Sequence, residues 1–368
     1  MTKYRRLAIR HDKSQMDCVI EGVPDQIAYA LADDDVPTPS RRYDRCVVLG
    51  MGGSALPVDV IADAFFGGVS TGSLVSWRRY GMPPSDNRKT LYIASSFSGT
   101  TEETIDGLHH LIKNGYAADT MVIAARGDVI DLAKQHRLPF VRLRADEREP
   151  SGFQPRSATG YFVAYLVRLL EAAGILRGAT KELRAVPASL RKASQRLRGE
   201  AEEIAQRLSK QRMAVLLTDD SYERSIGRIF AIKLYENAKR PALYASLPEA
   251  NHNLMIGLSR PFKGRKLVGE FGLLYVSDPD SDPRVHARFE VMRKLFKGPR
   301  YRHIAMSSWE MTGKTRIEKI FTALMFADWC SYTLALLDGE DPTPVELVER
   351  FKRKLADSRP SPSRRRQS

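Results

Sequence analysis

Short apolar runs alternate with longer amphipathic stretches along the first half of the chain. Helical spacing of apolar residues, as in 56–66, separates several of these runs. Strands are predicted for "DRCVVLG" (44–50), "GSLVSW" (72–77), "TLYIASS" (90–96), "DTMVIAA" (119–125) and "LPFVRL" (138–143). Strands that alternate with helices in this way predict an α/β fold with a doubly wound parallel sheet.

A second cycle of the same kind begins at "MAVLLT" (213–218). Further strands are expected in 242–247, 266–277 and 301–308, and helices in 222–239, near 283–297, in 314–337 and in 344–356. The pattern therefore predicts a second α/β half, although the two halves share no repeat at the level of individual residues.

The pattern also divides the chain into parts. We expect an N-terminal helical segment (1–39, with its helix at 14–32), a first domain (40–176), a helical connector (177–212), a second domain with C-terminal helices (213–357) and a disordered basic tail (358–368). The tail is rich in serine, proline and arginine and has too few apolar residues to pack.

Composition agrees with two domains of ordinary size. The 368 residues are 43% hydrophobic, enough for a sizeable core. The formal charge of +14 raises the possibility of a nucleic-acid partner. Much of the excess lies in 177–212 and after Phe351, and no helix-turn-helix, zinc-finger or RNA-recognition signature accompanies it. We therefore expect solvated helix faces and a loose tail, and no specific nucleic-acid partner.

The same sequence predicts a cytoplasmic protein without a membrane partner. No signal peptide is evident, and no segment approaches the roughly 20 apolar residues of a membrane span. Cys18, Cys46 and Cys330 lie far apart, without the spacing of a zinc site or a disulfide framework.

Two bends that follow predicted strands carry glycine and hydroxyl residues. "GMGGSA" (50–55) and "SSFSGTT" (95–101) each lead into a helix, whose N-terminal N–H groups and dipole favour an anion. The candidate phosphate-binding residues are Gly53, Ser54, Ser96, Ser98 and Thr101. The simpler alternative is that each bend only caps a helix, and capping alone explains Glu102 and Glu103 in the first turn.

Dinucleotide binding is a second alternative, because 50–55 fits the pattern G-x-G-x-x-A. No acidic residue ends the next strand, where Arg78 and Arg79 stand instead, and these would suit a 2′-phosphate at best. A dinucleotide fold also leaves the second hydroxyl bend without a role. A phosphomonoester is the preferred ligand.

The second half supplies candidates for acid–base chemistry. Glu236, in "YENAK", ends an apolar helix, where partial burial would suit a carboxylate to proton transfer. His252, in "PEANHN", stands between two asparagines whose amides would fix the imidazole orientation and tautomer. A surface or paired carboxylate and a structural turn histidine remain the alternatives. His109 and His110 lie on a helix without such neighbours and are taken as structural.

Six segments in this order resemble the bifunctional phosphoglucose/phosphomannose isomerase family, whose members have two domains of the sugar isomerase (SIS) fold. They are "GMGGSA", "SFSGTTEET", "QPRSATG", "ENAK", "PEANHN" and "DPTPVELVERFK", and the similarity spans nearly the whole chain. The resemblance implies two doubly wound SIS-type αβα domains with parallel sheets, plus N-terminal and C-terminal helices. Phe97, Thr100 and Ala250 depart from the family pattern, so the hexose preference of this chain is left open.

The resemblance also implies a role for each candidate residue. The two bends would hold the 6-phosphate of a hexose, Arg156 would stabilise an enediolate, and Glu236 would move a proton between C1 and C2. His252 of the neighbouring copy in a homodimer would help to open the sugar ring, together with Lys352, or Lys354 in its place.

These groups form a chemically coherent set, because a base, a cation and ring-opening assistance are what aldose–ketose isomerisation needs. The predicted activity interconverts glucose 6-phosphate and fructose 6-phosphate, and mannose 6-phosphate as well, without a metal or redox cofactor. The alternatives are a sugar-phosphate sensor without catalysis and an NADP-dependent enzyme that uses Arg78.

Overall fold

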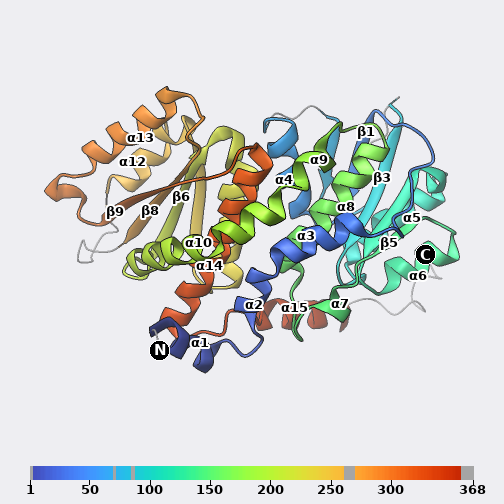
Figure 1. Ribbon diagram of the computed structural model, residues 1–368, viewed down its shortest axis with the longest axis horizontal. Coiled ribbons are helices and arrows are strands. Elements are labelled where there is room, and N and C mark those ends of the chain that lie inside the picture. The colour runs from blue at the N-terminus through green and yellow to red at the C-terminus, as the bar shows by residue number, and fades with distance from the viewer. Residues whose placement is uncertain (1–2, 69–71, 84–87, 261–269, 358–368) are drawn as a thin grey trace, which may run out of the picture.

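The computed structural model describes residues 3–68, 72–83, 88–260 and 270–357, and its strands form two separate sheets (Figure 1). Sheet A has the order β2-β1-β3-β4-β5 and sheet B the order β7-β6-β8-β9. Every pair of neighbouring strands is parallel. The α/β class predicted from the sequence is confirmed.

The strand bounds follow the predicted apolar runs closely. Sheet A contains β1 (Arg45–Leu49), β2 (Leu74–Trp77), β3 (Thr90–Ser96), β4 (Thr120–Ala124) and β5 (Phe140–Arg142), and sheet B contains β6 (Met213–Asp219), β7 (Ala242–Leu247), β8 (Phe271–Ser277) and β9 (Ile304–Glu310). Every residue of β1, β3 and β4 is buried, as is typical of parallel strands that helices cover on both faces.

Helices cover both sheets and join them. They are α1 (Lys3–His11), α2 (Met16–Glu21), α3 (Val23–Ala32), α4 (Leu56–Phe65), α5 (Glu102–Lys113), α6 (Asp128–Gln135), α7 (Ala145–Arg148), α8 (Thr159–Ala172), α9 (Ala179–Leu183), α10 (Val186–Leu208), α11 (Ile229–Glu236), α12 (Leu254–Leu258), α13 (Pro283–Leu295), α14 (Arg316–Asp338) and α15 (Glu346–Asp357).

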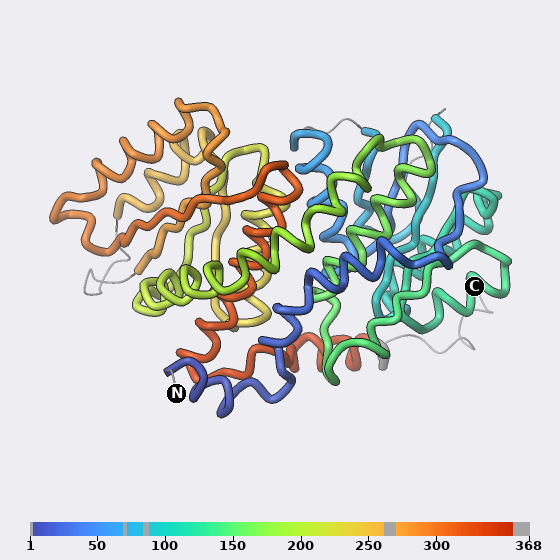
Figure 2. The backbone as a smooth tube through the Cα atoms, viewed as in Figure 1, coloured from blue at the N-terminus to red at the C-terminus, as the bar shows by residue number. Residues whose placement is uncertain are grey.

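The N-terminal segment differs from the prediction of one helix over 14–32. Gly22 ends α2, where its N–H donates to the carbonyl groups of Cys18 and Ile20, and α3 begins at the next residue with Pro24 in its first turn. The helix α1 was not predicted, and it packs with α2 against α14 from the other end of the chain (Figure 2).

The basic connector is helical, as predicted. The helix α10 buries one apolar side, including Leu190, Leu197 and Ile204. On its exposed surface, Arg196 pairs with Glu200 at 2.9 Å and Arg207 with Glu203 at 3.9 Å, each one turn apart. Much of the positive charge here therefore belongs to a solvated helix face.

The helix α14 forms the centre of the molecule and packs along α10 (Figure 2). It is long and apolar enough to cross a membrane, which the sequence reading overlooked. However, 89% of its most apolar window is buried inside the protein, as in the core helix of a globular domain.

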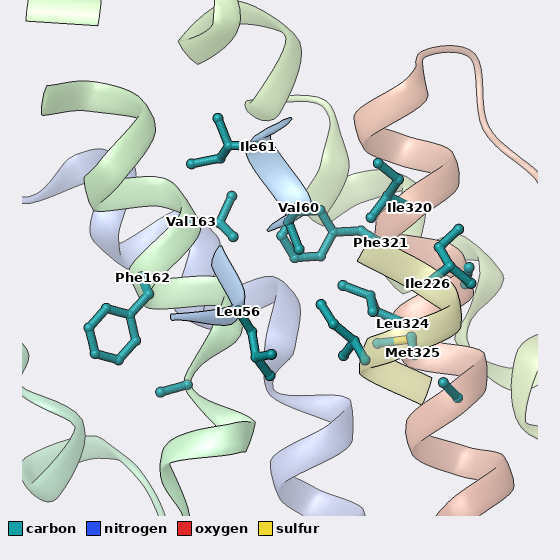
Figure 3. Packing of buried hydrophobic residues seen from close by; sticks show 14 of the residues in the cluster. Leu56, Val60, Ile61, Phe162, Val163, Ile226, Ile320, Phe321, Leu324 and Met325 are labelled. Atoms are coloured by element: carbon teal, nitrogen blue, oxygen red, sulfur yellow. The ribbon is translucent and has the colours of Figure 1, made fainter. Parts of the chain in front are cut away.

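One continuous core joins the two halves. Leu56 and Val60 of α4 face Phe321 and Leu324 of α14, and Ile226 of the second half packs among them (Figure 3). The domain limits predicted above stay a prediction, and the predicted disordered tail (358–368) lies outside the described residues.

The helix predicted over 222–239 has an unexpected first part. Glu223–Arg228 form a π-helix, and only Ile229–Glu236 are α-helical. The backbone N–H of Ser225 donates to Oδ2 of Asp63 in α4 at 2.7 Å. This bond ties the irregular turn to the first half, which is a tertiary contact that the local pattern does not contain.

Candidate active site

The two glycine-and-hydroxyl bends meet at the carboxyl edge of sheet A. The strands β1 and β3 are neighbours, and the chain order reverses between them. Ser54 Oγ accepts a hydrogen bond from the Phe97 N–H at 2.9 Å, and Ser95 Oγ donates to the Ser54 carbonyl at 2.9 Å. The bends thus form one unit where open α/β sheets bind ligands.

The second bend requires Gly99 at its apex. Its φ is +71°, and a Cβ there would lie 1.7 Å from the Arg126 carbonyl oxygen. Ser96 Oγ accepts from the Gly99 N–H at 3.1 Å and lies 2.9 Å from Thr101 Oγ1. The hydroxyl groups of Ser96 and Thr101 are therefore gathered inside the bend.

Helix capping does not account for these hydroxyl groups. Thr101 occupies the N-cap position of α5, but in the described structure its side chain makes no capping hydrogen bond. Ser98 Oγ accepts from the Thr100 N–H at 3.3 Å, also within the bend. The arrangement fits an anion site better than the capping alternative.

The first bend touches the backbone that carries Arg156. A Cβ at Gly53 would lie 2.6 Å from the Arg156 nitrogen and 2.6 Å from the Pro155 carbonyl carbon. Real Cβ atoms do not approach other atoms so closely, so a residue without a side chain is needed at Gly53. The predicted phosphate cradle and Arg156 are therefore in direct contact.

Arg156 is buried, with 2% of its surface exposed, and is held on several sides. Its Nε donates to Asn237 Oδ1 at 2.6 Å, and its Nη2 donates to the carbonyl oxygens of Pro342 at 3.0 Å and Thr343 at 2.8 Å. Asn237 in turn donates from Nδ2 to Ser331 Oγ of α14 at 3.0 Å. The guanidinium group is therefore fixed before any ligand binds.

The remaining guanidinium nitrogen faces Glu236. Arg156 Nη1 lies 3.2 Å from Glu236 Oε2, but the geometry does not make a hydrogen bond. Burial lowers the pKa of Arg156, and the charge of Glu236 opposes this shift. With 34% of its side chain exposed, Glu236 is an accessible carboxylate beside a buried cation. The structure thus brings together two residues that stand 80 positions apart.

His252 and Glu236 lie at opposite ends of the strands of sheet B. Glu236 ends α11 near the start of β7, where the neighbouring Tyr235 hydroxyl donates to the Ala242 carbonyl at 2.9 Å. His252 follows the far end of β7 and is exposed. Six residues at about 3.3 Å each give β7 a length of about 20 Å. His252 and Glu236 of one chain therefore do not share a site.

The asparagines beside His252 do not orient its ring, contrary to the prediction. Asn251 Nδ2 contacts the Met255 sulfur at 3.3 Å, and Asn253 Nδ2 donates to Glu249 Oε1 at 2.7 Å. Both amides are therefore engaged away from the ring, Asn253 within the turn and Asn251 with Met255 and, at 3.8 Å, with the Met292 sulfur of α13.

Lys352 and Lys354 lie on α15, which is exposed. Lys352 Nζ pairs with Glu349 one turn away at 2.7 Å. Among the described residues, no contact joins either lysine to Arg156 or Glu236. The lysine of the proposed ring-opening step therefore stays unassigned between them.

Residues that sequence reasoning did not select surround the Arg156–Glu236 pair. Asn237 and Lys239 belong to the quoted "ENAK" motif, which was a signal that could have identified them. Lys233, one turn before Glu236, pairs with Asp328 of α14 at 2.5 Å in the interior. No local pattern indicates this pair, since its members lie 95 residues apart.

The structure weakens the nucleotide alternative. Arg78 is paired with Asp59 at 2.7 Å, and it donates to the Ala55 carbonyl at 3.2 Å, while Arg79 lies over the Trp77 ring. Both arginines therefore have local structural roles. Within the described residues, no group of three or more His, Cys, Asp or Glu side chains is arranged to hold a metal ion.

Comparison with known proteins shows which fold and which family this chain resembles. Residues 197–355 match the family "Bacterial phospho-glucose isomerase C-terminal SIS domain". The C-terminal domain of glucosamine-fructose-6-phosphate aminotransferase from Francisella tularensis shares the fold, with a TM-score of 0.67 and 14% identity over 90% of this chain and 98% of that one. A hypothetical protein from Thermus thermophilus has a TM-score of 0.66 and 17% identity, with 96% and 93% covered.

Two relatives align over nearly their whole length. The bifunctional phosphoglucose/phosphomannose isomerase of Caldicellulosiruptor bescii is 26% identical over 92% of this chain and 98% of its own. The protein of the same name from Aquifex aeolicus is 28% identical over 92% and 97%. The family resemblance, and with it the prediction of an enzyme of the SIS isomerase class, is confirmed.

Proposed function

We propose that the protein interconverts glucose 6-phosphate and fructose 6-phosphate, and also mannose 6-phosphate, through a cis-enediol intermediate. The observation that carries this proposal is the unbroken path of contacts from the hydroxyl bends through Gly53 and Arg156 to Glu236. An anion held at the bends and a base at Glu236 then belong to one site.

Each group has a defined task in the proposed reaction. Ser54, Ser96, Ser98, Thr101 and the backbone at Gly53 hold the 6-phosphate, so that binding energy far from the reacting carbons positions C1 and C2. Glu236 takes the proton from one carbon and returns it to the other. Arg156 Nη1, which lies 3.2 Å from Glu236 Oε2, would donate to an enediolate oxygen as charge develops on it.

The site is completed by a second copy of the chain in this proposal. His252 of one chain is separated from Glu236 of the same chain by the length of β7. A partner copy in a homodimer would supply His252 for ring opening, with Lys352 or Lys354 sharing that role. The cytoplasmic location predicted from the sequence is part of the same proposal.

A coupled assay with glucose 6-phosphate and mannose 6-phosphate in parallel tests the reaction. Glu236→Gln is expected to lower turnover by about 10²- to 10⁴-fold, because it removes the base, while inorganic phosphate still binds at the bends. Glu203→Gln on the exposed face of α10 is the matched control and keeps full turnover. Near-normal turnover of Glu236→Gln would contradict the mechanism, and binding of both sugars without turnover by the wild type would favour a sensor.

Mixing two inactive proteins tests the shared site. His252→Ala and Glu236→Gln chains, refolded or exchanged together, are expected to regain part of the turnover through hybrid sites that contain one intact copy of each residue. Size-exclusion chromatography with light scattering confirms that the mixture is dimeric. Dimers that stay inactive would show that His252 does not act across the interface.

A further inference from the structure

The connector between α14 and α15 (339–345) is held by two cationic side chains of the candidate site. Arg156 Nη2 donates to the carbonyl oxygens of Pro342 and Thr343 at 3.0 and 2.8 Å. Lys239 Nζ donates to the preceding carbonyl, that of Asp341, at 2.5 Å. Three successive carbonyl groups thus accept hydrogen bonds from two positive charges, which is an unusually specific attachment for an irregular segment.

Lys239 is tied to Arg156 on a second side as well. Its Nζ donates to the Asn237 carbonyl at 3.2 Å, and the Asn237 side chain accepts from Arg156 Nε at 2.6 Å. Asn237 and the connector are the two supports that hold Arg156 in place. The ammonium group of Lys239 contacts both of them.

The backbone at Lys239 is in a conformation that side-chain-bearing residues avoid. Its φ is +54°, in the left-handed region. Such a conformation is unfavourable at a residue other than glycine, and it persists where the surrounding structure imposes it. Here it accompanies a lysine whose ammonium group reaches the connector.

We propose that Lys239 is a positioning residue of this site, acting through the connector and Asn237 to hold the Arg156 guanidinium beside Glu236. This proposal rests on the proposed function. Loss of the Lys239 hydrogen bonds to Asp341 and Asn237 would leave the phosphate cradle unchanged, because among the described residues no contact joins Lys239 to the hydroxyl bends. It would allow Arg156 to shift relative to Glu236, and a displacement of about 1 Å can cost about 10²-fold in rate.

The charge of Lys239 is sensitive to pH. Lys239 is exposed as a whole residue, but partial desolvation of its ammonium group and the nearby Arg156 charge lower its pKa to about 8, against the opposing influence of Asp341, Glu340 and Glu236. The ammonium group is therefore charged below about pH 8 and loses its proton as the pH rises through that value. A neutral amine makes weaker hydrogen bonds to the carbonyl groups, so turnover is expected to decline on the alkaline side.

The test compares Lys239→Met, Lys239→Arg and the exposed control Lys210→Met. Lys239→Met is expected to lower kcat by about 10- to 100-fold, with KM and inhibition by inorganic phosphate nearly unchanged. Lys239→Arg keeps a cation and should restore most of kcat while moving the alkaline decline to higher pH. Lys210→Met should behave as the wild type.

Hydrogen–deuterium exchange of 339–345 separates this proposal from the proposed function. The connector should exchange faster in Lys239→Met than in the wild type, and this holds even if the wild type does not isomerise hexose phosphates. The proposal is overturned by unchanged exchange, by an unchanged kcat in Lys239→Met, or by a loss of kcat that Lys239→Arg does not rescue. A parallel loss of phosphate binding would also overturn it, because that would indicate general unfolding of the site.

Discussion

The carboxyl edges of the two parallel sheets have the same topology and opposite chemistry. In both sheets the chain order reverses between two central strands, β1 and β3 in sheet A and β6 and β8 in sheet B. The edge of sheet A carries glycine bends with Ser54 and Ser96. The edge of sheet B carries the buried carboxylates Asp219 and Asp278.

The polar groups of sheet B satisfy one another. Asp278 accepts from Lys319 Nζ at 2.6 Å and from the Tyr222 hydroxyl at 2.5 Å, and Asp219 accepts from the Tyr275 hydroxyl at 2.5 Å. Although burial alone would raise it, the pKa of Asp278 lies below its usual range because Lys319 and Tyr222 donate to the carboxylate. Two carboxylates at this edge also repel an anion.

The comparison shows that a shared fold does not imply a shared site. Topology places helix N-termini and strand ends together in both halves. The side chains at that place decide whether it binds a ligand or whether its polar groups hydrogen-bond to one another. The structure is consistent with one phosphate site per chain, at sheet A. Three substitutions test this contrast.

The largest effect is expected from Lys319→Met at sheet B. Removing the cation leaves Asp278 buried without its charge partner, which should cost about 3–5 kcal/mol in the free energy of unfolding. Urea denaturation measures the loss, and phosphate inhibition of the folded fraction should be unchanged. Because the pKa of Asp278 is depressed, its charged form stabilises the wild type above the ordinary aspartate pKa of 3.8. This stabilisation is lost as the pH falls through the lower pKa of Asp278 in the folded protein. In acid, the free energy of unfolding of the variant should therefore differ little from that of the wild type.

The control for this substitution is the double variant Lys319→Met/Asp278→Asn, which removes both charges and should recover part of the stability. If Lys319→Met weakened phosphate binding while leaving stability intact, the edge of sheet B would be a ligand site after all.

A smaller effect is expected from Gly99→Ala at sheet A. The positive φ alone costs about 1–2 kcal/mol in an alanine. The new Cβ would also clash with the Arg126 carbonyl, so the total destabilisation should reach about 3 kcal/mol and phosphate binding should weaken. Gly115→Ala is a matched control, because Gly115 has φ +83° and a Cβ at that position would have nothing within 4 Å. The difference in thermal stability between the two variants measures the contact of the new Cβ with the Arg126 carbonyl. Equal losses of stability in both variants would indicate that the clash is relieved without disturbing the bend.

The smallest effect on stability is expected from Ser54→Ala, which removes one of the two hydrogen bonds between the bends at a cost of about 1 kcal/mol. It should also raise the inhibition constant for inorganic phosphate. Ser281→Ala at sheet B, where the hydroxyl donates to Asp219, should cost similar stability without changing that constant. Equal inhibition constants for inorganic phosphate in Ser54→Ala and Ser281→Ala would argue against a phosphate site at the glycine-and-hydroxyl bends.

Local pattern alone determined the strands and the two glycine bends of this protein. The strands were predicted within a few residues, because apolar runs in a parallel sheet are buried on both faces and tolerate few polar positions. The bends were identified because two glycine-and-hydroxyl segments follow strands of the same predicted sheet and each leads into a helix N-terminus, which favours an anion. The prediction of one N-terminal helix over 14–32 was wrong at Gly22, although Gly22 and Pro24 are local signals that could have indicated the break.

Only the tertiary structure decided how Arg156, Glu236, Asn237 and Lys239 stand relative to one another. Their contacts join segments 80 to 187 residues apart, and such long-range pairs leave no periodic signal in the sequence. The same holds for the distance between His252 and Glu236, which follows from the direction of β7 in the sheet. Sequence thus specified the chemical groups, and packing specified which of them can act together.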